Sequence, residues 1–200
     1  MKKLIILACL TASVSLAAGT ALADSIKGKL GVSGKIGFLV PADNDPDFVV
    51  NRQNNTDVGF VGGGGFIYGI DDHIAVEFEI TRTDFGSNNG DFGITNVTLG
   101  GQYRFKIDQP KLVPYLGGGL DILLSDFDPS SGSRRDVDTT VGFHASGGLD
   151  YFIQRNIALN AEAKLLAAPD TSINDSSGIH RGDFDPSSFS TTFGIRYFFP

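Results

Sequence analysis

Residues 74–81 read Ile-Ala-Val-Glu-Phe-Glu-Ile-Thr, and this stretch decides the fold. Large apolar side chains occupy every second position, and small, acidic or hydroxyl side chains lie between them. Alternation with a period of two predicts a β-strand that has one apolar face and one polar face. The polar face carries Glu77 and Glu79, and such carboxylates need either water or a cationic partner.

The same alternation recurs along the rest of the chain. Eight strands are expected, at roughly 29–40, 57–70, 74–81, 97–105, 112–124, 140–151, 157–165 and 189–199. Short connections lie near 71–73, 108–111 and 154–156, and long ones span roughly 41–55, 82–91, 125–137 and 167–188. An even number of strands with alternating short and long connections predicts an all-β fold. This is an eight-stranded antiparallel up-and-down transmembrane barrel with short periplasmic turns and long extracellular loops.

A soluble β-sandwich or a lipocalin-like barrel is the alternative, and three features of the sequence argue against it. Glycine makes up 26 of 200 residues and is concentrated on the polar face, where it leaves room inside a narrow barrel. Four of the five tyrosines lie on the apolar face near the short turns, as in an aromatic girdle. The polar face also mixes both charge signs, which indicates buried pairs. The residues expected to form this polar plug in the lumen are Lys29, Lys35, Glu77, Glu79, Arg104, Asp121, His144, Asp150, Glu162, Lys164 and Arg196.

The inward face becomes apolar near the expected extracellular ends of the strands. The residues expected to line this apolar mouth are Leu39, Val61, Leu123 and Leu166. An apolar funnel above a polar plug would admit an apolar solute and stop it partway. Pro41, which cannot donate to a strand ladder, could help to open a gap between strands there. The alternative is that the leucines simply close the mouth and that Pro41 simply ends a strand.

The N-terminal residues indicate export. A positive start, an apolar stretch and Ala21-Leu22-Ala23 predict a signal peptide over residues 1–23, with the barrel over 24–200. A lipoprotein signal ending at Cys9 is the alternative. The net charge is −7, or −9 without Lys2 and Lys3, which argues against nucleic acid as a partner. The single cysteine excludes a disulfide framework and a Cys-rich metal site, and we expect no cofactor, no metal and no catalytic site.

Several segments resemble the OmpW family of small outer-membrane barrels. They are residues 71–77, 112–120, 147–162 and the terminal stretch 193–199, in the family's order and spacing. The resemblance implies a narrow channel for small hydrophobic molecules that are released sideways into the membrane. It also implies outer-membrane lipid and lipopolysaccharide as surroundings, and insertion by the barrel-assembly machinery, which reads an aromatic end such as Phe199. The chain contains no tryptophan, so no tryptophan gate can be transferred to it.

Two other functions are alternatives to the channel. A non-conducting structural or interaction barrel would display the long acidic loops, in which Asp-Phe-Asp-Pro-Ser-Ser occurs at both 126–131 and 183–188. The aspartates of this repeat are either turn residues or ligands for a divalent cation. An enzyme would need His144, Ser146 and Asp150 to act together. They lie on one face of one strand, where residues i and i+2 are ~6.5–7 Å apart, too far for a nucleophile to bond its base directly.

Overall fold

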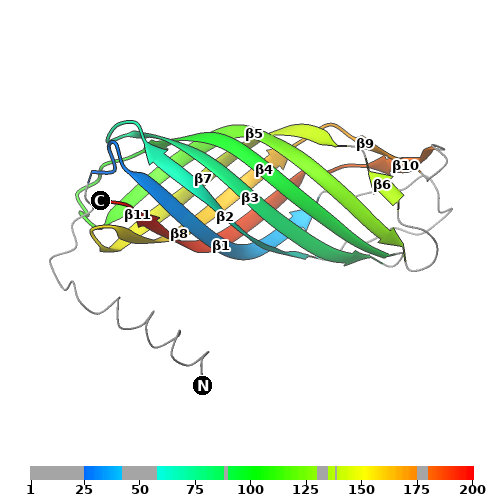
Figure 1. Ribbon diagram of the computed structural model, residues 1–200, viewed down its shortest axis with the longest axis horizontal. Helices are drawn as coiled ribbons and strands as arrows, with labels where there is room; N and C mark the ends of the chain where they lie inside the picture. The colour runs from blue at the N-terminus through cyan, green and yellow to red at the C-terminus, as the bar shows by residue number, and fades with distance from the viewer. Residues whose placement is uncertain (1–24, 42–57, 88–89, 130–134, 138, 175–179) are drawn as a thin grey trace, which may run out of the picture.

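The computed structural model describes residues 25–41, 58–87, 90–129, 135–137, 139–174 and 180–200. Eight strands form a closed antiparallel barrel, because each pairs with the next and β1 pairs with β11 (Figure 1). They are β1 (Leu30–Pro41), β2 (Gly59–Gly69), β3 (Ile74–Ser87), β4 (Gly90–Arg104), β5 (Leu112–Pro129), β7 (Thr140–Gln154), β8 (Ile157–Ala167) and β11 (Ser188–Phe198). The expected fold class is confirmed. No helix among these residues is long and apolar enough to cross a membrane.

The connections at the end of the barrel opposite the short turns differ from expectation. β3 and β4 stay paired up to Ser87↔Gly90, so most of 82–91 is a hairpin rather than a loop. Three short strands, β6 (Arg135–Val137), β9 (Thr171–Asn174) and β10 (His180–Phe184), extend the sheet beside β5 within the expected loops 125–137 and 167–188. The expected bounds of these loops were therefore wrong, because backbone pairing continues past the last residues of the apolar alternation. The expected loop 41–55 and the expected signal peptide 1–23 lie outside the described residues.

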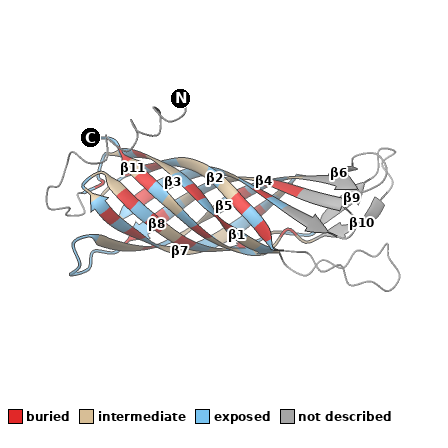
Figure 2. Ribbon diagram, turned by 90° about the horizontal axis from the view of Figure 1, so that it is seen from below, coloured by how far each residue is buried: buried red, intermediate tan, exposed pale blue. Residues whose placement is uncertain are grey.

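The two faces of the wall have opposite chemistry, which gives the banded burial pattern of Figure 2. Large apolar side chains point outward and are exposed, as Phe78, Leu99 and Phe193 illustrate. Tyr68, Tyr103 and Tyr151 are exposed at the strand ends next to the short turns. An outward apolar band with an aromatic rim is what a transmembrane barrel presents to lipid.

The interior has an apolar layer at the short-turn end that sequence reasoning missed. Phe152 and Phe198 stack with ring centroids 5.9 Å apart. They belong to a buried cluster that also contains Ile26, Ile67, Ala75 and Ala158. Phe152 and Phe198 occupy inward positions between outward aromatic or apolar neighbours, so the alternation that marks faces elsewhere is hidden there. An apolar layer therefore lies in the lumen at this end, and the polar layer lies above it.

The turn between β2 and β3 is held by one carboxylate. Asp71 Oδ1 accepts hydrogen bonds from the backbone N–H groups of His73 and Ile74, at 2.7 Å each. These two bonds hold the pKa of Asp71 below its ordinary value of 3.8. A depressed pKa means that the contribution to stability is present above 3.8 and is lost as the pH falls through the folded-state pKa.

We therefore expect this turn to loosen selectively in acid. Hydrogen-exchange protection of the His73 and Ile74 amides should fall as the pH drops below 3.8 in the wild type. Asp71→Asn keeps the accepting oxygen but does not titrate, so its protection should stay constant over the same range. Equal acid sensitivity in both proteins would contradict this assignment.

Candidate functional site

A chamber opens in the lumen at the end opposite the short turns. Its cavity volume is about 40 Å³, and it is partly open to solvent. All four residues expected at the mouth line it, together with Ile94 and Pro186, which were not anticipated. Ile94, Leu123 and Leu166 pack together as a buried cluster. The upper wall of the chamber thus carries an apolar ring contributed by β1, β2, β4, β5, β8 and the segment before β11. Thr83 of β3, the register partner of both Val61 and Ile94, interrupts this ring. The lining side chains of this ring are Leu39, Val61, Ile94, Leu123, Leu166 and Pro186.

The floor of the chamber is a set of ion pairs. Lys35 Nζ lies 2.5 Å from Glu79 Oε1 and 3.1 Å from Glu162 Oε1. Lys164 Nζ lies 3.4 Å from Glu79 Oε2. Lys35 on β1 and Glu79 on β3 meet across the intervening β2, where their register partners are Gly63 and Gly65. Glycine at these inward positions leaves the space through which the two side chains meet.

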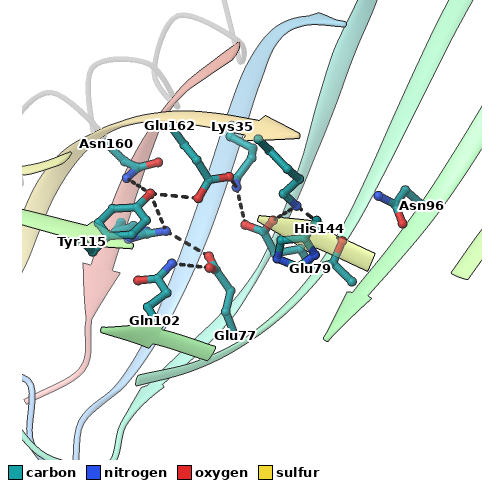
Figure 3. Close-up of polar contacts among 12 residues, drawn as sticks. Lys35, Glu77, Glu79, Asn96, Gln102, Tyr115, His144, Asn160 and Glu162 are labelled. Carbon is teal, nitrogen blue, oxygen red and sulfur yellow. Dashed lines mark hydrogen bonds and ion pairs between the residues drawn. The ribbon is translucent and has the colours of Figure 1, made fainter. Parts of the chain in front are cut away.

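A second group of charges lies below the floor and is centred on two arginines. Figure 3 shows its members Glu77 and Gln102 beside Tyr115. Arg196 is fully buried and donates to both carboxylate oxygens of Asp150, at 3.1 and 3.0 Å, and to Glu77 at 3.0 Å. Arg104 donates to Asp150 at 2.7 Å. Asp150 is therefore held by two guanidinium groups, which is the kind of multiple partnership that a fully buried carboxylate requires.

Tyr115 joins the two groups of charges. Its hydroxyl donates to Glu162 Oε2 at 2.8 Å and accepts from Asn160 Nδ2 at 2.9 Å. The guanidinium carbon of Arg196 lies 5.0 Å from the centre of the Tyr115 ring, within range of a cation–π contact. Sequence reasoning did not single out Tyr115, Asn160 or Gln102, although Gln102 donates to Glu77. The sequence does contain a signal for Tyr115, because it is the one tyrosine whose position in the alternation predicts an inward side chain.

His144 is part of a smaller cluster beside the floor. Its Nδ1 lies 2.5 Å from Asp121 Oδ2, and Asp121 Oδ1 accepts from Thr98 Oγ1 at 2.6 Å and Asn96 Nδ2 at 2.7 Å. The acid beside His144 is thus Asp121 on the neighbouring strand. Asp150, the acid considered from sequence, lies among the arginines. This geometry does not assemble a nucleophile, base and acid from His144, Ser146 and Asp150.

One expected member of the polar plug lies elsewhere. Lys29 precedes β1 at the short-turn end, where its carbonyl accepts from the Gly69 N–H at 3.0 Å, and it is half-buried. The alternation counted Lys29 with the inward residues, but the regular ladder begins one residue later, at Leu30. The other ten expected plug residues lie on barrel strands and take part in the contacts above.

The acidic repeat is only partly described. The side chains of 126–131 and of 183–184 lie outside the described set. In the second copy, Asp185 Oδ1 accepts from the Ser187 N–H at 2.8 Å, and Ser187 Oγ contacts the backbone of Ala168. This local bond is the turn chemistry of aspartate.

The space for Tyr115 depends on a glycine, which leads to a prediction. A Cβ at Gly148 would overlap the Tyr115 ring and approach the Ala161 carbonyl. We expect Gly148→Ala to displace Tyr115 from Glu162 and Asn160 and to lower the free energy of unfolding by about 1–3 kcal/mol. Urea unfolding in lipid vesicles measures this. Gly147→Ala is the matched control, since its Cβ would meet the nearest atom at 3.4 Å, an ordinary contact. Equal effects of the two substitutions would contradict the role given to Gly148.

Comparison with known proteins agrees with this architecture. The family model described as "Outer membrane protein beta-barrel domain" matches residues 7–197. No curated protein is significantly similar in sequence. Three solved structures share the fold at low sequence identity. The outer membrane protein OprG from Pseudomonas aeruginosa is 20% identical with a TM-score of 0.68, covering 89% of this chain and 99% of that one. Neisserial surface protein A is 18% identical, with a TM-score of 0.66 and 85% and 97% coverage. Outer membrane protein AlkL, solved in lipid bilayers, is 17% identical, with a TM-score of 0.58 and 92% and 95% coverage.

The family match and the closed eight-stranded wall both place the molecule in the outer membrane. The match spans nearly the whole chain, and the outward apolar band needs lipid around it. The expected outer-membrane location and the expected type of barrel are confirmed. The chain belongs to the outer membrane protein β-barrel domain family, as an eight-stranded barrel in the bacterial outer membrane.

Proposed function

We propose that this barrel is a narrow entry route for small hydrophobic molecules, which enter the chamber from outside and leave sideways into the membrane. The observation that carries the proposal is the apolar ring of the chamber, set directly above a layer of paired charges. Burying apolar surface in such a ring is favourable by roughly 25 cal/mol per Å². An apolar solute therefore lowers its free energy by entering the chamber, and it lowers it no further by moving deeper into the barrel.

The layers below the chamber make straight passage costly. A solute moving along the barrel axis would have to separate ion pairs such as Lys35–Glu162 and then displace the stacked rings of Phe152 and Phe198. Leaving a buried charge without its partner costs about 3–5 kcal/mol. A sideways exit into lipid keeps these pairs intact and keeps the solute in apolar surroundings.

The position that we propose for the sideways exit is between β7 and β8, where a solute would have to separate strands that pack closely at Gly142 and Ala167. Their described ladder ends at Phe143↔Ala167, next to Leu166 of the chamber. Beyond the paired ends of β7 and β8, the next described pairing is Val137↔Ile173, between β6 and β9. Phe143 and Leu165, which flank the end of the ladder on the outside, are strongly exposed. Pro41 gives weaker support for an exit at β1, because it remains in register with Ser188 of β11.

An uptake assay tests the proposal. The charged sugar layer of the outer membrane resists apolar solutes, so cells that carry the barrel should accumulate n-octane faster than cells without it. Leu123→Asp puts a charge into the apolar ring, and we expect uptake to fall by about tenfold, with a larger fall when Leu39 and Leu166 are also replaced by Asp. Gln109→Asp is the control, because it adds the same charge at an exposed position in the short turn before β5, at the end of the barrel away from the chamber.

Folding is checked in each variant by heat-modifiable gel mobility. Unchanged octane uptake in the folded triple variant would contradict the proposal. A folded wild type that gives no uptake advantage and no conductance in a planar bilayer would favour the rival function. That function is a non-conducting structural or interaction barrel that displays acidic loops.

Export and assembly complete the proposal. We expect residues 1–23 to be removed as a signal peptide, the barrel-assembly machinery to insert residues 24–200, and outer-membrane lipid and lipopolysaccharide to surround the apolar belt. N-terminal sequencing of the protein purified from outer membranes would check the cleavage after Ala23.

A further inference from the structure

The chamber combines its apolar ring with hydrogen-bonding atoms that the fold leaves unused. Asn96 Oδ1 and Thr192 Oγ1 are buried, and within the described part of the chain neither makes a hydrogen bond. Both residues line the chamber, where Asn96 is the register partner of Leu123 of the apolar ring and Thr192 is that of Glu162 of the floor. An unused acceptor or hydroxyl in a buried site costs free energy unless something that enters the site bonds to it.

The orientation of the Asn96 amide is fixed by its neighbour. Asn96 Nδ2 donates to Asp121 Oδ1 at 2.7 Å. Turning the amide over would bring its oxygen against the carboxylate, where two acceptors repel each other. Asp121 is itself held by Thr98 and His144, so it cannot move away. The atom that Asn96 offers to the chamber is therefore an acceptor, which calls for a donor on the ligand.

A donor for the ligand lies in the same cluster. Lys164 Nζ reaches across the lumen to Thr98 Oγ1 at 3.5 Å and Glu79 at 3.4 Å, both long contacts. Lys35 Nζ, in contrast, is held at 2.5 and 3.1 Å by two carboxylates. Lys164 is thus the floor cation with the looser contacts, and it also lines the chamber.

The charges of the floor select the kind of head group. Two lysines, Lys35 and Lys164, face two glutamates, Glu79 and Glu162, around the chamber, so the floor is balanced. A ligand carboxylate or ammonium would add an unpaired charge to a buried and balanced site, which is costly. A hydroxyl is neutral and both donates and accepts, so it satisfies Asn96 and Lys164 together.

We propose that the chamber selects small neutral amphiphiles with a terminal hydroxyl, such as medium-chain alcohols, over pure hydrocarbons and over fatty acids. The tail lies against the apolar ring, and the hydroxyl donates to Asn96 Oδ1 and accepts from Lys164 Nζ. This inference rests on the proposed function, because it assigns the substrate class of the same chamber.

The test is binding of matched six-carbon ligands to the folded protein in lipid nanodiscs, followed by NMR. The ligands are 1-hexanol, hexanoate and n-hexane, and each affinity is corrected for partition into protein-free nanodiscs. We expect 1-hexanol to bind about threefold to tenfold more tightly than n-hexane, as one added hydrogen bond would give. We also expect nuclear Overhauser contacts from its tail to the Leu123 and Leu166 methyl groups, and a shift of the Asn96 side-chain amide.

Asn96→Leu removes the acceptor at nearly constant volume and should abolish the preference for 1-hexanol while keeping n-hexane binding. Thr191→Val is the control, since Thr191 lies on the outward parity of β11 and should leave the preference intact. The NMR contacts in the wild type decide the matter even if Asn96→Leu does not fold.

Equal affinity for 1-hexanol and n-hexane, or tightest binding of hexanoate, would overturn this inference. It would leave the proposed function standing if octane uptake still depends on Leu123. Loss of that dependence would overturn the proposed function instead, so the two failures are distinguishable.

Discussion

Replacing Arg196 by leucine is expected to lower the free energy of unfolding of the barrel by about 3–5 kcal/mol, the range measured when one partner of a buried ion pair is removed. Equilibrium unfolding by urea in lipid vesicles, followed by heat-modifiable gel mobility, gives this quantity. A loss of this size is a large part of the stability of a typical domain. We therefore expect a reduced yield of folded barrel as well.

The geometry around Arg196 explains the size of the effect. Its side chain is fully buried, and its two terminal nitrogens reach Asp150 on β7 and Glu77 on β3. A leucine would leave Asp150 with Arg104 and Asn160 only, and Glu77 with Gln102. Both carboxylates would remain buried in the lumen, where water cannot replace the lost donors.

Two control variants separate charge from geometry. Arg196→Lys keeps the positive charge but cannot contact Asp150 and Glu77 with a planar fork, so we expect an intermediate loss. Arg155→Leu removes an exposed arginine in the turn between β7 and β8 and should change the stability by less than about 0.5 kcal/mol. If Arg196→Leu were as mild as Arg155→Leu, the polar layer would not be what holds the lower barrel together.

Much of the wall could be predicted because each strand carries its own pattern. In 74–81 the alternation of Phe78 and Ile80 with Glu77 and Glu79 assigns both faces without any knowledge of the neighbouring strands. The structure places these glutamates inside and the apolar residues outside. Local pattern is sufficient here because the period of a strand is fixed by backbone geometry.

The partners of the charges could not be predicted, because they depend on closure of the barrel. Arg196 and Glu77 are 119 residues apart and meet only across the lumen. Tyr115 joins Glu162 and Asn160 from a third strand. Which inward residues share a height is set by the register of every strand in the ring, and no single strand carries that information.

The apolar residues of the interior were hidden for a different reason. Pro186 lies in the expected loop 167–188, and Ile94 lies between the expected loop 82–91 and the expected strand 97–105, so their parity was not counted. Phe152 and Phe198 lie in runs where both parities are apolar or aromatic. An apolar side chain in such a run can face lipid or lumen, and only the three-dimensional register decides which.

The outward face leads to the second large effect. Phe193 is 59% exposed and lies in the middle of β11, between Ile36 of β1 and Ala161 of β8. A central position in a spanning strand lies near the bilayer midplane. We expect Phe193→Arg to lower the free energy of unfolding in lipid vesicles by about 2–4 kcal/mol, the measured cost of arginine at that depth.

The same substitution at another depth is the control that gives this prediction its meaning. Phe199 is 43% exposed but lies just past the end of β11, so Phe199→Arg reaches the interface and should cost about 0–1 kcal/mol. On a water-facing strand both positions would tolerate arginine within about 0.5 kcal/mol. Equal and small costs at the two positions would therefore mean that the apolar belt does not lie in hydrocarbon. A steep difference between them requires a membrane, because only the bilayer gives two exposed aromatic positions such different surroundings.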